Sequence, residues 1–90
     1  MLPNNLDSTT WRELVSRLIK ADMAKKRLKY EDLSQLLAAH GTKQSADNLR
    51  NKINRGILGA DLYLQLLLVL NIKQLDRDAI LEILDDIIES

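Results

Sequence analysis

The chain contains no cysteine and no phenylalanine, and it has a single proline (Pro3) and a single histidine (His40) among its 90 residues. Without cysteine it can form no disulfide bond and offers no thiolate as a nucleophile or metal ligand. His40 stands beside Gly41, where a histidine is more often a helix-end or surface residue than a catalytic base. The sequence contains no nucleophile–base pair, phosphate-binding glycine loop or metal-ligand spacing. We therefore expect that the protein is not an enzyme and that it binds no metal, other cofactor or small-molecule substrate.

Long apolar runs and targeting signals are also missing. The longest apolar stretch, LYLQLLLVL at residues 62–70, is well short of the roughly 20 residues that span a membrane. No N-terminal segment has the basic, apolar and small-residue order of a signal peptide. The lack of cysteine fits a reducing compartment, and we therefore expect a cytoplasmic protein without membrane association.

The formal charge sums to zero, yet it is divided unevenly along the chain. Residues 1–56 hold 11 Lys or Arg and 6 Asp or Glu, a net +5, whereas residues 57–90 hold 2 and 7, a net −5. A binding surface responds to local potential, so this asymmetry is more informative than the sum. The neutral total still argues against a nucleic-acid partner, because many such proteins are basic overall.

Apolar residues recur with helical spacing in five segments, and alternating runs typical of β-strands are absent. We therefore predict a single all-α domain over residues 1–90, with five short helices joined by short connections. The run near the middle is apolar on most sides and is expected to be the central element of the core. The predicted helices cover residues 11–26, 30–39, 46–55, 60–70 and 76–89, after a flexible N-terminus at 1–9.

Local signals indicate where these helices begin and end. Thr10 and Glu13 have the spacing of a capping box at the start of the first helix. Ser45 has the position of an N-cap for the third. The C-terminal ends are expected at residues that tolerate a left-handed backbone: Gly41, Gly56 and Asn71.

The third predicted helix is unusually polar, with three basic residues and three asparagines at positions 48–55. Leu49 and Ile53 are expected to point inward, which leaves the amides and cations on the surface. A solvated helix more often pairs Glu with Lys at i, i+4, yet no Glu occurs between residues 33 and 81. Asn and Arg can bind base edges bidentately, and Lys and Arg neutralise phosphates, so this helix is a candidate nucleic-acid contact.

The segment YEDLSQLLAAHG, followed by SADNLRNKINRGILGADLYLQLLLVLNI, resembles the helix-turn-helix core of the lambda-repressor/Cro type. Residues 33–34 match the leucine–small pair of the first motif helix. Residues 53–56, INRG, match the I-x-R-G type signature that ends the recognition helix, and 66–72 match the following leucine-rich helix. With Trp11 upstream, the pattern is also similar to a family of small bacterial proteins known only as a domain of unknown function. The resemblance covers about residues 11–75.

The repressor resemblance implies a sequence-specific, DNA-binding transcriptional regulator that acts at an operator on double-stranded DNA. Bases and nearby phosphates would then be contacted by the start and outer face of the third helix: Lys43, Gln44, Ser45, Asn48, Arg50, Asn51, Lys52 and Arg55. Of these, the two arginines are expected to contact phosphates alone. Further phosphate contacts are expected where the first helix ends: Lys26, Arg27 and Lys29.

Two other functions stay open. A protein-interaction adaptor would keep the helix-turn-helix fold without DNA binding, and the neutral net charge favours it. An antitoxin would combine DNA binding with a toxin-binding tail, although no disordered tail is evident. The adaptor and the regulator differ in whether the cations of the third helix form one continuous positive surface with those that end the first.

The last predicted helix lies beyond the repressor resemblance and carries a broad apolar stripe: Ile80, Ile83, Leu84, Ile87 and Ile88. The stripe can pack on the first helix or form the seam of a homodimer, which a palindromic operator would mirror. We favour the seam, because the first four helices would already supply a self-sufficient core. In a seam, Leu84→Asp would give a folded monomer, whereas against the first helix it would unfold the chain. The acidic outer face of this helix is expected to stay away from DNA.

Overall fold

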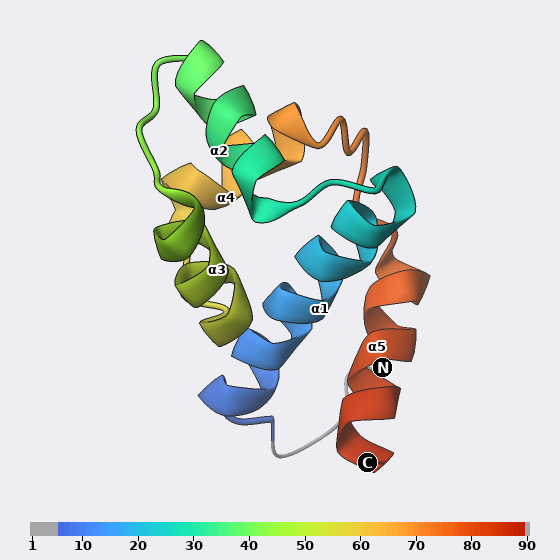
Figure 1. Ribbon diagram of the computed structural model, residues 1–90. Coiled ribbons are helices and arrows are strands. Elements are labelled where there is room, and N and C mark those ends of the chain that lie inside the picture. The colour runs from blue at the N-terminus through green and yellow to red at the C-terminus, as the bar shows by residue number, and fades with distance from the viewer. Residues whose placement is uncertain (1–5, 90) are drawn as a thin grey trace.

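The computed structural model describes residues 6–89, and within that range the chain is helical, with no strand (Figure 1). The all-α prediction with five helices is thereby confirmed. The largest difference from the predicted bounds is at the start of the first helix. The helices are α1 (Ser8–Lys26), α2 (Tyr30–Ala39), α3 (Ala46–Arg55), α4 (Ala60–Val69) and α5 (Arg77–Glu89).

The start of α1 corrects the predicted capping box. Asp7 is the N-cap instead of Thr10, and its carboxylate accepts hydrogen bonds from the Thr10 backbone N–H at 2.8 Å and the Thr10 hydroxyl at 2.9 Å. A carboxylate is favoured here because it also interacts with the positive end of the helix dipole. These hydrogen bonds, the backbone one foremost, lower the pKa of Asp7. Ser8 and Thr9 therefore belong to α1 and not to a flexible N-terminus, of which residues 1–5 lie outside the described range.

The other predicted helix ends are confirmed. The Ser45 hydroxyl accepts a hydrogen bond from the backbone N–H of Asn48 at 3.0 Å and so caps α3. Gly41, Gly56 and Asn71 follow α2, α3 and α4 with φ values of 89°, 66° and 58°. Each donates its backbone N–H to a carbonyl three residues earlier, which ends the helix and turns the chain.

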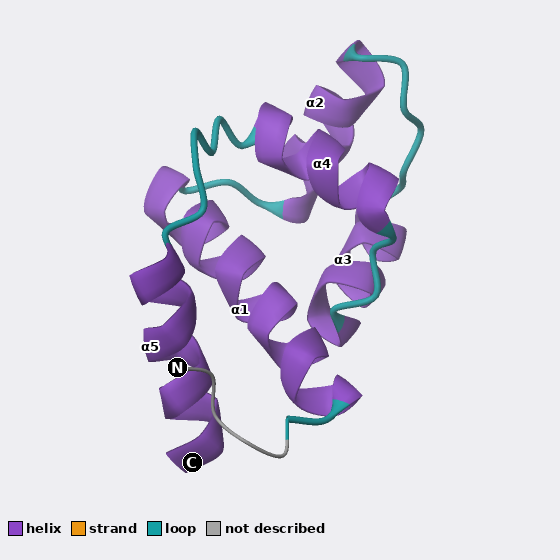
Figure 2. Ribbon diagram, turned by 180° about the vertical axis from the view of Figure 1, so that it is seen from behind, coloured by secondary structure: helices purple, strands orange, loops and turns teal. Residues whose placement is uncertain are grey.

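α1 lies between α3 and α5, as Figure 1 and Figure 2 both show. α3 packs on one side of α1, α5 runs along another, and α3 and α5 do not touch each other. α2 packs on both α3 and α4. The main hydrophobic cluster draws on α1 to α4 and the residue after α4: Ile19, Met23, Leu33, Leu37, Leu49, Ile53, Leu62, Leu66 and Leu70.

α4 is not the central helix that its composition predicted. Leu62 and Leu66 are buried, whereas Leu64 and Leu68 are 58% and 80% exposed. Residues four apart share one face of a helix, so the two pairs point in different directions. α4 thus adds one stripe to the core and packs on α2, whereas α1, α2 and α3 each pack on two other helices.

α5 packs on α1 within the monomer, so the prediction of a dimer seam is wrong for Leu84, which is fully buried. Of the predicted stripe, Ile80, Ile83 and Ile87 are half-buried, and only Ile88 is largely exposed. The main hydrophobic cluster does come from the first four helices and the residue after α4, but α1 is apolar on more than one side. Leu14 of α1 and Leu84 of α5 are both buried outside that cluster, and α1 and α5 pack on each other.

At Gly56, which ends α3, the backbone lies directly against the backbone of α1. A Cβ built on Gly56 would lie 1.9 Å from the carbonyl oxygen of Arg12, far inside any allowed contact. Gly56 also has a positive φ, which L side chains rarely adopt. Glycine is therefore required here twice over, and the position of α3 on the first half of α1 depends on it.

Gly56→Ala should destabilise the protein far more than Gly41→Ala. Both glycines have a positive φ, so each substitution carries a backbone cost of about 1–2 kcal/mol. A Cβ at Gly41 meets nothing within 4 Å, whereas a Cβ at Gly56 overlaps the Arg12 carbonyl and must push α3 from α1. The free energy of unfolding in urea measures both variants. Equal losses would contradict the close approach of the two helices.

Leu84→Ala should lower the free energy of unfolding by about 2–5 kcal/mol, because it empties a fully buried position. Ile88→Ala, on the same helix at a residue 48% exposed, is the matched control and should cost clearly less. Leu84→Asp should unfold the monomer, since the carboxylate would be buried without a partner. Circular dichroism during urea titration follows all three variants. A folded, monomeric Leu84→Asp protein would instead restore the dimer seam.

Candidate nucleic-acid interface

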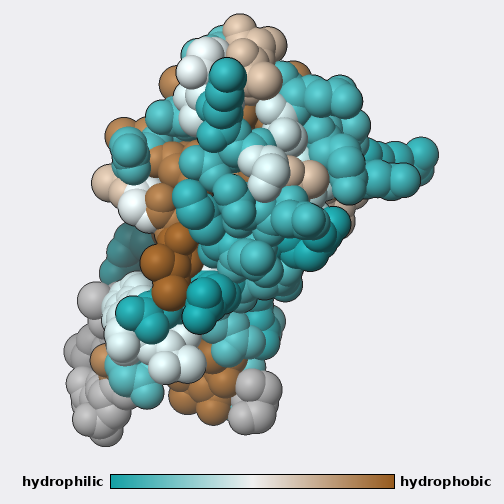
Figure 3. Space-filling view, turned by 60° about the vertical axis from the view of Figure 1, so that its left-hand side comes forward, coloured by the Kyte–Doolittle hydropathy of each residue, from teal (hydrophilic) through white to brown (hydrophobic). Residues whose placement is uncertain are grey.

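α3 is anchored by Leu49 and Ile53, which are both fully buried, as the sequence predicted. Asn48, Asn51 and Arg55 are exposed on its other sides. Figure 3 looks at the side of the molecule that carries α3 and shows a surface that is mostly hydrophilic, with a smaller apolar band. α3 therefore combines a narrow buried stripe with a broad polar surface.

Hydrogen bonds hold the start of α3 in place. The Ser34 hydroxyl of α2 donates a hydrogen bond to the backbone carbonyl of Gln44 at 2.6 Å, which joins α2 to the connection before α3. The Gln44 side-chain oxygen accepts a hydrogen bond from Lys52 Nζ at 3.3 Å, and the Ser45 hydroxyl is used in the N-cap. Of the three residues predicted to meet bases at this end, Lys43 is exposed and has no ion pair within residues 6–89.

Arg50 is held by two carboxylates and an aromatic ring. Its guanidinium lies 2.5 Å from Asp47 Oδ1 and 3.8 Å from Glu31 Oε1, with its carbon 5.3 Å from the centroid of the Tyr30 ring. Arg50 was predicted to contact a phosphate, but these carboxylates offset its positive charge. The ion pair with Asp47 could be predicted from the i, i+3 spacing on one helix. The ion pair with Glu31 could not, because it depends on how α2 and α3 pack.

The cations at the end of α1 do not extend the surface of α3. Figure 1 shows α3 beside the first half of α1, whereas Lys26 and Arg27 stand at the opposite end of that helix. Lys26 pairs with Asp22 at 2.8 Å and also donates a hydrogen bond to the Leu70 carbonyl. Lys29 precedes α2, and Glu31 of that helix is one of the two carboxylates that hold Arg50. Lys26 and Arg27 therefore stand apart from α3, and one cation of each group, Lys26 and Arg50, is paired with a carboxylate.

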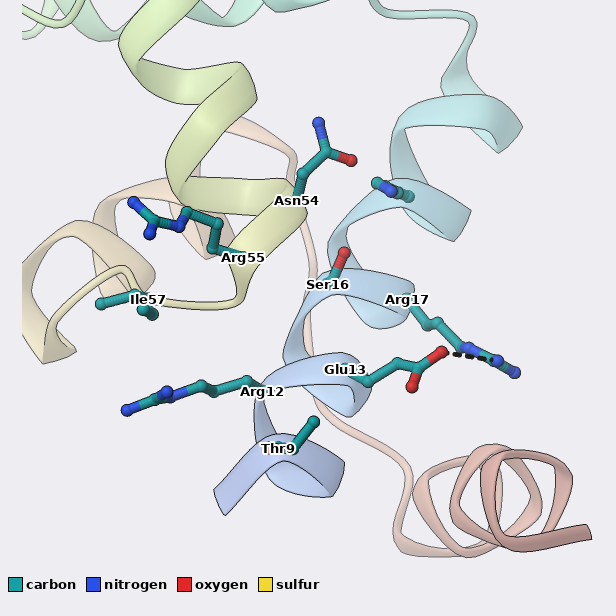
Figure 4. Close-up of a pocket in the computed structure, with 9 residues that line it drawn as sticks. Thr9, Arg12, Glu13, Ser16, Arg17, Asn54, Arg55 and Ile57 are labelled. Atoms are coloured by element: carbon teal, nitrogen blue, oxygen red, sulfur yellow. Dashed lines mark hydrogen bonds and ion pairs between the residues drawn. The ribbon is translucent and has the colours of Figure 1, made fainter. Parts of the chain in front are cut away.

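A different group of cations lies beside α3. A hollow of about 520 Å³ lies beside the contact of Gly56 with Arg12, lined by the first half of α1 and the C-terminal end of α3 (Figure 4). It is lined by four cations and one carboxylate: Arg12, Arg17, Lys20, Arg55 and Glu13. Arg17 is paired with Glu13 at 2.8 Å, whereas the other three cations have no ion pair within residues 6–89. The site thus carries an excess of positive charge.

The side chains around this hollow come from two helices. In Figure 4 Arg12 and Arg55 extend in the same direction from α1 and α3, Arg17 extends the opposite way, and the Ser16 hydroxyl points into the space between the helices. Of these four residues only Arg55 was predicted from the sequence to contact DNA. The spacing of Arg12, Ser16 and Lys20 at i, i+4 and i+8 was the available signal, because it aligns them on one face of a helix.

Neither a metal centre nor a membrane span is evident in the described part of the chain. Residues 6–89 bring together no group of three or more His, Asp or Glu side chains able to hold a metal ion. None of the helices α1 to α5 combines the length and the apolar content that crossing a bilayer requires.

Comparisons with curated proteins and with solved structures return no match. A family model does match residues 11–75, from the first turn of α1 to the connection before α5. The matched region includes α3, the Gly56 contact with Arg12, and both walls of the hollow, and it leaves α5 outside. The predicted similarity to a family known only as a domain of unknown function is thereby confirmed. The chain belongs to the family described as Domain of unknown function (DUF6471).

Proposed function

We propose that this protein binds double-stranded DNA through α3 and acts as a sequence-specific transcriptional regulator of the lambda-repressor/Cro helix-turn-helix kind. The observation that carries the proposal is the outer surface of α3, where exposed asparagines stand beside cations on a firmly anchored helix. The major groove is about 12 Å wide and admits an α-helix. Asparagine recognises adenine there through two hydrogen bonds, while lysine and arginine neutralise phosphates.

The arrangement of α3 supports Asn51 as the base contact. Asn51 is two residues from each of Leu49 and Ile53, which at about 100° per residue puts it opposite the buried stripe. Asn54 is less free, because its amide donates a hydrogen bond to the Arg50 carbonyl at 2.8 Å. Arg55, exposed and without an ion pair in the described residues, is the better phosphate contact of the two arginines.

The distribution of charge supports the same orientation. α5 carries five acidic side chains: Asp78, Glu82, Asp85, Asp86 and Glu89. It lies across α1 from α3 and does not touch it (Figure 2). A duplex that meets α3 would therefore stay clear of this acidic helix, and the neutral total charge does not oppose binding.

We further propose that the regulator acts as a homodimer, since two-fold operators are read by two copies of the recognition helix. With Leu84 covered by α1, such a dimer has to use other surfaces than the full stripe of α5. Ile88 is the part of that stripe that stays largely exposed.

A second candidate function, the protein-interaction adaptor, is favoured by α4. Leu64 and Leu68 are largely exposed there. A hollow beside Leu68 is also lined by Leu37, His40 and Gln65. The side-chain oxygen of Gln65 is buried and has no hydrogen-bond partner within residues 6–89. A protein that docks on α4 would cover the two leucines and could supply the missing donor.

Binding to duplex DNA should weaken with rising salt along a straight line of log K against log salt concentration, because bound phosphates release counterions. Fluorescence anisotropy on labelled random and genomic fragments measures this, with circular dichroism to confirm that the protein is folded. A folded protein that binds no duplex at low salt would contradict the regulator and favour the adaptor.

Arg55→Ala and Asn51→Ala should have different effects on DNA binding. Loss of a phosphate contact at Arg55 should weaken all sequences alike, whereas loss of Asn51 should relax the preference at one base pair by about 1–3 kcal/mol. Gln35→Ala, which removes an exposed amide from α2, is the control and should change neither property. The affinity of each of the three variants is measured for a selected DNA site and for single-base variants of that site. Uniform losses for both α3 variants would refute the assignment of roles.

A further inference from the structure

We propose that the hollow between α1 and α3 holds the phosphodiester backbone of the duplex whose bases α3 contacts. This inference rests on the proposed function and extends the interface from α3 to the first half of α1. It assigns phosphate binding to Arg12 and Lys20, which line the same hollow as Arg55, in place of the cations at the far end of α1.

The charge of the hollow favours an anion. Four cations and one carboxylate line it, and the carboxylate is already paired with Arg17. Three positive charges thus stand around one hollow of about 520 Å³ without an ion pair in the described residues. These like charges repel one another, and an anion seated among them is attracted to each of them and so offsets the repulsion.

The hollow also offers hydrogen-bond donors suited to phosphate oxygens. The Ser16 hydroxyl points into the space between the helices, and guanidinium groups bind phosphate bidentately (Figure 4). Ser16 of α1 is buried, with 4% of its surface exposed, and it lines the hollow from that helix. The walls are fixed as well, because the Gly56 contact with the Arg12 carbonyl holds α3 and α1 together.

Continuity with α3 identifies the anion as a nucleic-acid backbone. Arg55 belongs both to the outer surface of α3 and to the lining of the hollow. A DNA strand that borders the groove occupied by α3 therefore needs only to continue past Arg55 to reach Arg12 and Lys20. Phosphates recur every 3.4 Å of helix axis along each strand, so a strand that passes the hollow presents several in succession.

Two double variants with equal changes in charge test this inference. Arg12→Gln/Lys20→Gln removes one arginine and one lysine from the hollow. Lys25→Gln/Arg77→Gln removes one of each from the end of α1 and the start of α5, both exposed and outside the hollow. Anisotropy titrations with duplex DNA at several salt concentrations compare them with the wild type and with Asn51→Ala. Circular dichroism confirms that each variant is folded.

The hollow variant should bind DNA less tightly. The slope of its log K against log salt concentration should be shallower than that of the wild type by about 1.8, that is about 0.9 for each lost phosphate contact. The control variant should keep most of the wild-type slope. Equal losses in the two variants would overturn the inference, because they would reflect net charge alone.

Failure of this inference is distinguishable from failure of the proposed function. One outcome is that the hollow variant binds DNA as tightly as the wild type while Asn51→Ala still relaxes the sequence preference. That result would contradict phosphate binding in the hollow and leave α3 as the DNA contact. No duplex binding by the folded wild type would overturn both. Thermal unfolding with inorganic phosphate alone tests a free anion as the occupant. If phosphate raises the Tm of the wild type but not of the hollow variant, while their DNA affinities match, the backbone assignment is wrong.

Discussion

The contact between Gly56 and the carbonyl of Arg12 determines where α3 stands on α1. The two backbones leave no room for a Cβ, and the positive φ of Gly56 ends α3 at the same point. Three features follow from this one contact: the direction of the outer surface of α3, the place of Arg55, and the hollow that the two helices line. The segment INRG at residues 53–56 therefore has two roles. Gly56 allows α3 to pack closely on α1, and Arg55 contributes positive charge beside it.

α1 also explains how a chain of zero net charge can present a basic surface. It packs on α3 along one side and on α5 along another, so it separates a basic region from an acidic helix. Charges on opposite sides of a small domain are screened from each other when they are more than about 8–10 Å apart at physiological salt. A ligand at α3 would thus respond to local cations, and the sum over the whole sequence is a poor guide to the partner.

Much of the helical framework could be predicted, because apolar spacing and capping residues act over a few residues; Ser45, Gly41 and Gly56 all mark the helix ends they predicted. The errors arise where packing decides. Composition could not tell which leucines of α4 face solvent, and the stripe on α5 did not reveal that α1 covers Leu84. At the candidate interface, the outer face of α3 was predictable from Leu49 and Ile53. The pairing of Arg50 with Glu31 and the placing of Arg12 and Arg55 around one hollow involve residues from different helices, and no spacing in the sequence indicates them.

The most direct test of the proposed interface is a map of backbone amide chemical shifts in the ¹⁵N-labelled protein as duplex DNA is added. The account predicts that the largest changes fall on the outer residues of α3 and on the first half of α1, near Asn51, Arg55, Arg12 and Lys20. Signals from α5 and from the exposed leucines of α4 should stay in place. Changes centred on Leu64 and Leu68, or none at all with folded protein at low salt, would contradict it.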